Sequence, residues 1–203
     1  MSVASLPRDP VPQDALPFEL QPFGGAAERS APGLATLALQ GEIWLRRSNS
    51  GALLNLSMAL QGLLPAPAPA PWLPPPAPSP GRRDGLWQHT CFELFLAPLG
   101  GAAYWELNLA PSGDWAVYRF DGYRSGQTSP CLEPPPFQLT RRPAGLRLDL
   151  RWPLPTELAA VPALRVGITT VLELTDGSLS YWALQHPGPE PDFHRCDSFS
   201  LRL

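Results

Sequence analysis

The distribution of proline and glycine is the feature of this sequence that most restricts its fold. The chain contains 28 prolines and 17 glycines, together 45 of its 203 residues, and they fall between the apolar segments rather than inside them. Both residues disfavour the interior of a helix, so long helices have little room. The apolar segments between them are therefore expected to be strands.

Inside those segments apolar and polar residues alternate with a period of two, which is typical of strands that bury one face. The predicted strands are residues 34–39, 42–47, 52–60, 91–97, 104–110, 115–121, 145–152, 164–174, 178–185 and 198–203. Thr175-Asp176-Gly177 predicts a tight hairpin because an Asp-Gly pair accepts positive φ angles. One helical turn is expected at residues 156–160, with Thr156 as its N-cap.

About ten strands with regular turns and one core predict an all-β fold, a two-sheet antiparallel β-sandwich with very little helix. We expect one domain over residues 1–203, because all-β units reach ~200–250 residues. Residues 65–80 hold nine prolines and predict a stiff Pro/Ala-rich surface excursion. Trp72 and Leu73 favour packing of this segment against the domain over recognition by a partner.

Composition excludes several classes of function. The formal net charge is −3 and there is no basic run, which argues against a nucleic-acid partner. No apolar stretch approaches ~18 residues and residues 1–12 lack the pattern of an export signal, so we expect a cytoplasmic protein that does not interact with membranes. Cys91, Cys131 and Cys196 form no CxxC pair and are expected to be free thiols.

Alternation also sorts the polar side chains of the middle strands by face. Phe92, Leu94 and Leu96 form one core set, and Trp105, Leu107 and Leu109 form another. This assignment leaves the polar side chains together on the opposite face, and Trp115, Tyr181 or Trp182 would supply aromatic side chains nearby. The polar residues on that face are Glu93, Tyr104, Glu106, Asn108 and Glu173.

A polar floor with aromatic walls is suited to sugars, whose hydroxyls bind carboxylates and amides while the ring stacks on indole or phenol. The alternative is that the acids form structural ion pairs with arginines, for which Arg119, Arg124 and Arg195 are available. Both interpretations stay open for Glu106 and Asn108. Ion pairing is favoured for Glu173.

The histidines and acids raise two further alternatives. His186, Asp192 and His194 have metal-ligand residue types, but the prolines between them predict a rigid loop in which Asp192 accepts backbone hydrogen bonds. Glu93 and Glu106 are candidate carboxyls of a glycoside hydrolase. Because such spacing is common in any sheet, we expect no catalysis.

Several short sequence motifs resemble those of a known family. They are Leu86-Trp87-Gln88-His89-Thr90-Cys91-Phe92-Glu93-Leu94-Phe95, Tyr104-Trp105-Glu106-Leu107-Asn108, Pro111-Ser112-Gly113-Asp114-Trp115, the segment 118–126, Ser180-Tyr181-Trp182-Ala183-Leu184 and the segment 186–194. Over residues 86–203 the chain resembles the DOMON-like family, which is similar to the type 9 carbohydrate-binding modules.

The resemblance implies a jelly-roll-like sandwich that holds a ligand between aromatic rings, with structural calcium in some relatives and haem b in others. By position it implies that Glu93, Glu106 and Asn108 line the pocket, with Trp87, Trp115 and Trp182 as the aromatic candidates. Two departures limit it: no signal peptide or second domain is evident, and Met58 is the only methionine besides Met1 to serve as a haem ligand.

We therefore expect a soluble, non-catalytic domain that binds a small polar ligand, a carbohydrate or sugar-like molecule, with no resident cofactor or metal. The alternatives are a haem-binding domain using Met58 or His186, a hydrolase using Glu93 and Glu106, and an interaction protein without a small ligand. The predicted ligand-binding residues are Trp87, His89, Glu93, Tyr104, Glu106, Asn108, Trp115, Arg124, Trp182 and His186.

Overall fold

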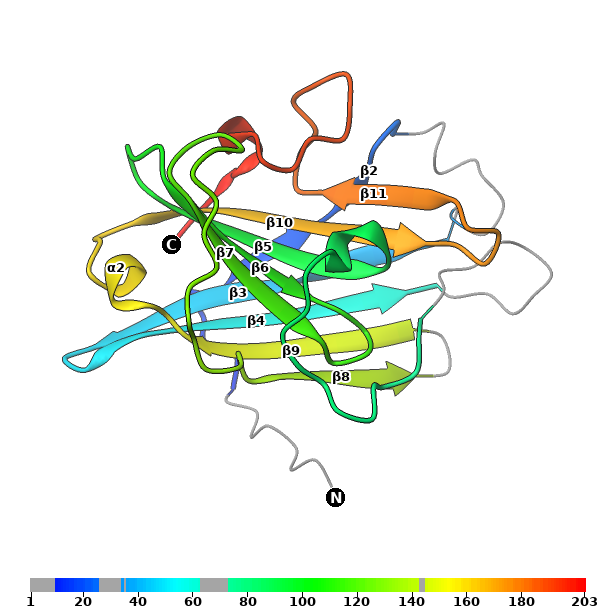
Figure 1. The fold of residues 1–203 in the computed structure, drawn as a ribbon, viewed down its shortest axis with the longest axis horizontal. Helices are drawn as coiled ribbons and strands as arrows, with labels where there is room; N and C mark the ends of the chain where they lie inside the picture. Colours follow the sequence, from blue (N-terminus) through cyan, green and yellow to red (C-terminus); the bar gives the residue numbers. More distant parts are fainter. Residues whose placement is uncertain (1–9, 26–33, 35, 63–72, 143–144) are drawn as a thin grey trace.

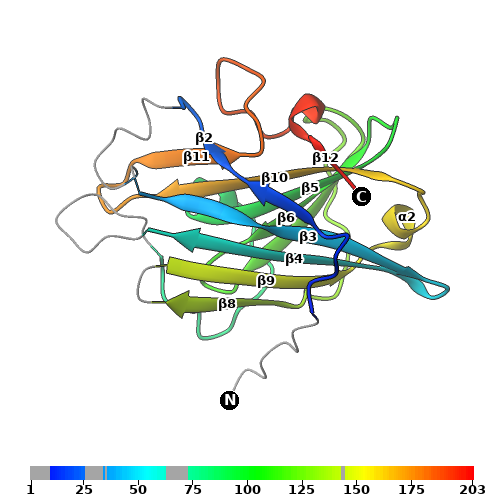
Figure 2. The same ribbon diagram turned by 180° about the vertical axis from the view of Figure 1, so that it is seen from behind.

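The computed structural model describes residues 10–25, 34, 36–62, 73–142 and 145–203, and these form two antiparallel sheets packed face to face (Figure 1). The first sheet has the strand order β1-β3-β4-β9-β8 and lies in front in Figure 2. Its strands are β1 (Leu16–Glu19), β3 (Ala38–Ser48), β4 (Gly51–Gln61), β8 (Phe137–Arg142) and β9 (Gly145–Pro153).

The second sheet has the order β2-β11-β10-β5-β6-β7, with β12 paired to β10. Its strands are β2 (Gln21–Pro22), β5 (Cys91–Pro98), β6 (Tyr104–Leu109), β7 (Trp115–Phe120), β10 (Leu164–Glu173), β11 (Leu179–Ala183) and β12 (Leu201–Arg202). The predicted all-β sandwich is confirmed.

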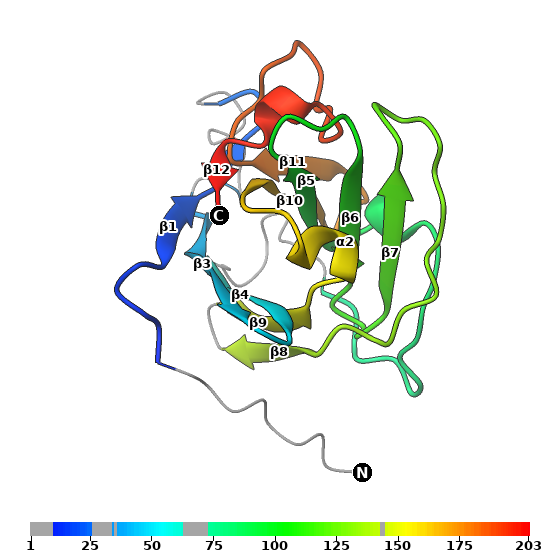
Figure 3. The same ribbon diagram turned by 90° about the vertical axis from the view of Figure 1, so that its left-hand side faces the viewer.

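Helix is confined to single turns among the described residues: η1 (Leu86–Gln88), α2 (Thr156–Ala159) and η2 (Cys196–Ser198). The turn at α2 was predicted, but its N-cap was not: Pro155 occupies that position and accepts the amide hydrogens of Leu158 and Ala159. Leu158 is fully buried, so α2 closes one end of the core between the sheets (Figure 3).

The core between the sheets contains the residues that alternation predicted. On β6, Trp105, Leu107 and Leu109 are buried within it, and on β5 the matching set is Phe92, Leu94 and Leu96. These side chains pack against leucines of β4 and β9 from the first sheet. Burying an apolar side chain of this size stabilises the fold by about 1.5–3 kcal/mol, so the core accounts for the stacking of the sheets.

Some strand boundaries differ from the prediction. Residues 34–39 and 42–47 were expected to be separate strands, but residues 38–48 form the continuous strand β3. Gly41 does not end it: a Cβ atom there would lie 2.1 Å from the carbonyl oxygen of Ser57 and 2.8 Å from the ring of Phe18, so glycine permits close pairing with β4. The strands β1, β2 and β8 were not predicted.

The C-terminal part of the sandwich contains one confirmed turn and one shortened strand. Gly177, with φ 83°, closes the predicted hairpin, and its amide donates to the carbonyl oxygen of Leu174. Residues 198–203 were predicted to be one strand, but only β12 pairs, because η2 precedes it and Phe199 turns onto the outer face of the second sheet.

The Pro-rich segment is described in part, since residues 63–72, including Trp72, lie outside the described residues. Leu73 packs against the core between the sheets, and the guanidinium of Arg141 donates to its carbonyl oxygen. The amide of Ala77 donates to the carbonyl oxygen of Ser112. In the described part of the chain, no helix has the length and apolar character needed to span a membrane.

Candidate functional site

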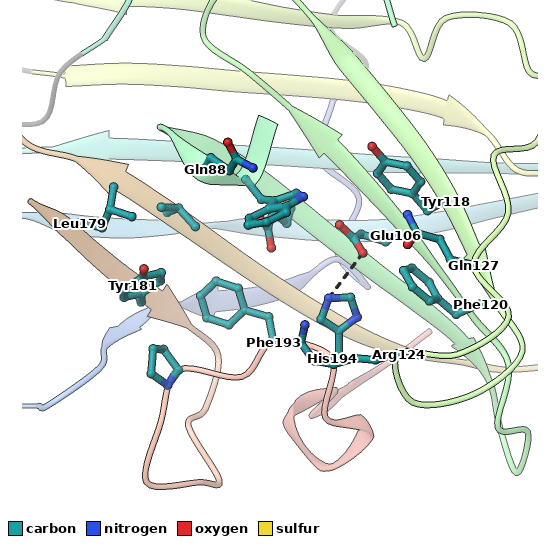
Figure 4. Close-up of a pocket in the computed structure, with 14 residues that line it drawn as sticks. Gln88, Glu106, Tyr118, Phe120, Arg124, Gln127, Leu179, Tyr181, Phe193 and His194 are labelled. Carbon is teal, nitrogen blue, oxygen red and sulfur yellow. Dashed lines mark ion pairs between the residues drawn. The ribbon is translucent and has the colours of Figure 1, made fainter. Parts of the chain in front are cut away.

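A cavity of about 550 Å³ lies on the outer face of the second sheet, the face turned away from the first sheet. Its aromatic and apolar walls include Trp87, Tyr118, Phe120, Leu179, Tyr181 and Phe193. Its polar lining consists of Gln88, Glu93, Glu106, Arg124, Gln127 and His194. Figure 4 shows Tyr181 and Phe193 on one side and Tyr118 and Phe120 on the other, with Glu106 and His194 turned toward each other between them.

Strand register brings two carboxyls to the floor of this cavity. Glu93 lies opposite Asn108 across the β5–β6 pair and opposite Thr169 across the β5–β10 pair. Glu106 lies two residues before Asn108 on β6 and therefore on the same face, opposite Tyr118 of β7. Glu93, Glu106 and Asn108 are exposed by only 5%, 4% and 0%. The predicted common face is confirmed, and it is buried.

Neutral groups supply the hydrogen bonds that the structure gives to these carboxyls. The side-chain amide of Asn108 donates to Oε1 of Glu106 at 2.6 Å, and the hydroxyl of Thr169 donates to Oε2 of Glu93 at 3.0 Å. Oδ1 of Asn108 is buried and has no hydrogen-bond partner among the described residues. An acceptor next to Glu106 is therefore left unsatisfied, although Asn108 itself does not line the cavity.

Burial makes the charged form of both acids unfavourable. It raises the pKa of Glu93 well above its usual range, and repulsion from Glu106 adds to the effect. The pKa of Glu106 is raised to about 7, again by burial, against the opposing hydrogen bond from Asn108 and attraction to Arg124. Below about pH 7 Glu106 is therefore mostly protonated, and the charged form of Glu93 is disfavoured as well.

His194 is the titratable group that faces Glu106 from the C-terminal loop. Its Nε2 lies 3.8 Å from Oε2 of Glu106, the contact marked by the dashed line in Figure 4. Burial and the nearby guanidinium of Arg124 lower the pKa of His194 to about 4. The imidazole is therefore neutral at pH 7 and supplies no positive charge to Glu106.

The hydroxyl of Tyr104 fixes the orientation of the His194 imidazole. The backbone amide of Arg124 donates to the Tyr104 hydroxyl oxygen at 3.2 Å, and this hydroxyl lies 2.7 Å from Nδ1 of His194. When the hydroxyl donates its proton to Nδ1, the ring hydrogen sits on Nε2, the nitrogen that faces Glu106. Edge contacts from Phe95 and Phe120 hold the ring in place.

The arginines named as structural partners of the acids pair elsewhere. Arg124 contacts Asp192 at 2.9 Å, Arg119 contacts Asp121 and Glu157, and Arg195 contacts Asp197. Glu173, for which an ion pair was favoured, contacts His89 at 2.9 Å instead of an arginine. Among the described residues, no arginine pairs with Glu93 or Glu106.

Six of the ten predicted site residues lie at the cavity. Trp87, Glu93, Glu106 and Arg124 line it. Tyr104 and Asn108 contact lining residues through the hydrogen bonds described above. Trp87 is 50% exposed and comes from η1.

The other four predicted site residues lie elsewhere. Trp115 and Trp182 are buried in the core between the sheets, because each pairs with a strand residue whose side chain points inward, Leu109 and Thr170 respectively. His89 is exposed and contacts Glu173. His186 bonds the carbonyl oxygen of Gln21 and packs against Phe23 at the β2 edge.

Ten of the fourteen lining residues were not predicted as site residues, among them Tyr118, Phe120, Phe193 and His194. Tyr118 and Phe120 point into the cavity as a direct result of Trp115 pointing inward, so the alternation rule applied to residues 115–120 would have found them. Phe193 and His194 reach the cavity because the C-terminal loop folds back over β5 and β6. No local pattern in the sequence marks that long-range contact.

The candidate metal and haem ligands do not converge. His194 and His186 make the contacts given above, and Asp192 accepts hydrogen bonds from Tyr123 and Arg124. Met58 is buried in the core between the sheets. Within the described ranges no three His, Cys, Asp or Glu side chains are grouped as a metal site, and Cys91, Cys131 and Cys196 are free.

Comparison with known proteins gives structural likenesses only. No protein-family model matches the chain, and the search of curated proteins gives no match. A proposed carbohydrate-binding protein from Bacteroides uniformis ATCC 8492 has a similar structure, with a TM-score of 0.61, 13% identity, and coverage of 91% of this chain and 84% of that chain.

A family 9 carbohydrate-binding module from Caldicellulosiruptor kristjanssonii, solved in complex with glucose, aligns with a TM-score of 0.37 and 12% identity over 72% of this chain and 66% of that chain. At such identities the Bacteroides likeness shows the sandwich fold. Membership of the DOMON-like family stays a prediction.

Proposed function

We propose that this protein binds a carbohydrate or sugar-like small molecule in the cavity on the second sheet, without altering it covalently. The observation that carries the proposal is the pair of buried carboxyls, Glu93 and Glu106, at the floor of an aromatic-walled cavity. Its volume of about 550 Å³ falls in the usual range of small-molecule sites. The structural likeness to a proposed carbohydrate-binding protein supports the same ligand class.

The chemistry of the lining matches both sides of a sugar ring. The carboxyls accept hydrogen bonds from hydroxyls, each contributing about 1.5–3 kcal/mol when charged. The apolar face of the ring stacks on an indole or phenol, which Trp87 and Tyr181 offer at the walls. A few such contacts correspond to an affinity between about 1 mM and 1 μM.

Titration calorimetry with a panel of mono- and disaccharides tests the proposal. Trp87→Ala removes a half-exposed wall and is expected to weaken binding by about tenfold. Leu99→Ala, which removes a side chain that is 48% exposed and outside the cavity, is the matched control and should bind normally. Absence of binding by any saccharide at about 10 mM would end the proposal.

The hydrolase alternative has one observation in its favour, since the raised pKa of Glu106, about 7, would keep a general acid protonated. A two-carboxyl hydrolase also needs an ionised partner, whereas burial raises the pKa of Glu93 as well. We therefore expect no release of a chromogenic aglycone from aryl glycosides. Release that disappears in Glu106→Gln would replace the binding proposal with the catalytic one.

A further inference from the structure

In the part of the chain that the structure describes, no arginine forms an ion pair with the acids at the cavity floor. Arg124 is the only arginine among the described residues that line the cavity; its side chain is 52% exposed and pairs with Asp192. Glu93 and Glu106 receive hydrogen bonds from Thr169 and Asn108, which carry no charge. Two adjacent buried carboxyls without a cation are unfavourable, and proteins usually pair such charges.

We propose that the ligand carries an ammonium group, which the cavity places between Glu93 and Glu106. The inference rests on the proposed function, because it concerns the same cavity, and it narrows the ligand class to amino sugars or similarly small hydroxylated amines. The ammonium supplies both the missing charge and hydrogen-bond donors. The remaining hydroxyls are left for Gln88 and Gln127, which also line the cavity.

Two independent features fit an ammonium better than a hydroxyl. Oδ1 of Asn108 is fully buried beside the acids without lining the cavity, and it has no hydrogen-bond partner among the described residues, so its uncompensated negative partial charge adds to that of the acids. The walls carry the rings of Tyr118, Tyr181 and Phe193, and aromatic faces attract cations. A hydroxyl provides one donor and an ammonium three.

Protonation relieves the charge in the free protein. Burial raises the pKa values of both Glu93 and Glu106, which favours protonated carboxyls in the free protein. The other titratable or charged groups that face the pair are Cys91, Tyr104, Tyr118, Arg124 and His194. None changes its protonation near pH 7, so an incoming ammonium displaces a proton from the pair and the net charge of the site is conserved.

The test compares matched sugars by titration calorimetry at pH 6.5. Glucosamine, galactosamine and mannosamine differ from glucose, galactose and mannose only in an ammonium that replaces a hydroxyl at one carbon. At least one amino sugar should bind about 10- to 100-fold more tightly than its parent hexose. Repeating the titration in two buffers of different ionisation enthalpy should show proton release with the amino sugar and almost none with the hexose.

Isosteric variants locate the effect. Glu93→Gln and Glu106→Gln each remove one carboxyl and are expected to abolish the preference for the amino sugar over its parent hexose, while both ligands bind more weakly because the carboxyls also accept hydrogen bonds from hydroxyls. Glu173→Gln is the matched control, because this third acid on the same sheet face contacts His89 and does not line the cavity. It should keep the full preference.

The outcomes separate the inference from the proposed function. Equal binding of hexoses and amino sugars, without proton release, would overturn the inference and leave carbohydrate binding intact. Tight binding of butylamine alone, with no contribution from hydroxyls, would support the ammonium site and overturn the sugar proposal. No binding by sugars or amines would overturn both. The proton-release measurement uses the unaltered protein, so a variant that fails to fold does not prevent a decision.

Discussion

The outer faces of both sheets carry acidic side chains, but the hydrogen-bond partners and the burial of these acids differ between the two faces. On the first sheet, Asp149 of β9 accepts hydrogen bonds from the guanidinium of Arg147 at 3.0 Å and from the hydroxyl of Ser57 at 2.7 Å. On the second sheet, Glu106 accepts from the neutral amide of Asn108. The side chain of Asp149 is 18% exposed and that of Glu106 is 5% exposed.

The difference shows when an acid on a sheet face indicates a ligand. Asp149 is explained by the protein's own cation, whereas Glu106 is buried in a cavity and has no arginine partner in the described part of the chain. The two outer faces also differ in the side chains that pack onto them. Phe193 and Phe199 of the C-terminal segment form one buried cluster with Phe95 and Tyr104 on the outer face of the second sheet.

Removing the ring of Phe199, which packs onto the outer face of the second sheet, should have the largest effect on stability. Phe199 is 4% exposed and stacks on Phe95 with ring centroids 5.4 Å apart. Phe199→Ala leaves a cavity and is expected to lower the free energy of unfolding by about 3–5 kcal/mol, as measured by urea denaturation. Leu99→Ala, at an exposed position, should change it by less than about 0.5 kcal/mol. A similarly small change at Phe199 would mean that the C-terminal segment is not part of the cooperative fold.

Neutralising the unpaired acid should stabilise the protein. The pKa of Glu106 is raised from 4.5 to about 7, so the folded state binds more protons than the unfolded state between these values. Glu106 therefore lowers stability as the pH rises from about 4.5 to 7, by up to about 3 kcal/mol at 1.4 kcal/mol per pKa unit. Glu106→Gln should remove this loss and unfold at higher urea concentration at pH 8, with little difference at pH 4.

His194 masks part of this effect, and removing the acids should reveal it. Burial lowers the pKa of His194 from 6.5 to about 4, so its contribution has the opposite sign: stability is lost as the pH falls from 6.5 to 4. In the unaltered protein the two contributions oppose each other between about pH 4.5 and 6.5. Glu93, whose pKa burial also raises, acts in the same direction as Glu106, so in Glu106→Gln stability should fall less steeply with pH across that window than in the unaltered protein. In the double variant Glu93→Gln/Glu106→Gln it should rise, and a double variant whose stability still falls toward pH 7 would show that the two acids are not the source of the loss.

The same change on the first sheet should have the opposite sign. Asp149→Asn removes the charge that pairs with Arg147, whose side chain is 31% exposed, while the amide keeps the shape of the residue. Solvent screens this pair, so the expected loss is about 0.5–1 kcal/mol in the free energy of unfolding at pH 7. If Asp149→Asn stabilised the protein as Glu106→Gln is expected to, the contrast between the faces would not depend on the cation partner.

Alternation was sufficient to predict the fold and the floor of the site. The period of two is a property of each strand alone, so Glu93, Glu106 and Asn108 could be assigned to one face without knowledge of the pairing. The same rule was not carried through residues 115–120, and Trp115 was taken as a wall although its register with Leu109 turns it inward. The error arose because the aromatic character of Trp115 was given more weight than its position in the alternation of the strand.

The walls could not be predicted because they depend on contacts between residues distant in sequence. His194 reaches Glu106 and Tyr104 across about 90 residues of chain, and it does so from an irregular segment without periodicity. The pairing of Arg124 with Asp192 instead of with the acids is equally non-local. Arg124 lies close enough to influence both carboxyls, yet Asp192 holds its guanidinium.

The smallest effect is expected for the acid that shares the outer face of the second sheet but not its cavity. Glu173 contacts Nδ1 of His89, whose side chain is 65% exposed. An ion pair so open to water contributes little, so Glu173→Gln should change the free energy of unfolding by less than about 0.5 kcal/mol and leave ligand affinity unchanged. Urea denaturation and calorimetry beside Glu106→Gln measure both quantities. If Glu173→Gln weakened ligand binding as strongly as Glu106→Gln, then an acid anywhere on the outer face of the second sheet would contribute to binding. Burial in the cavity would then not explain why Glu106 binds the ligand.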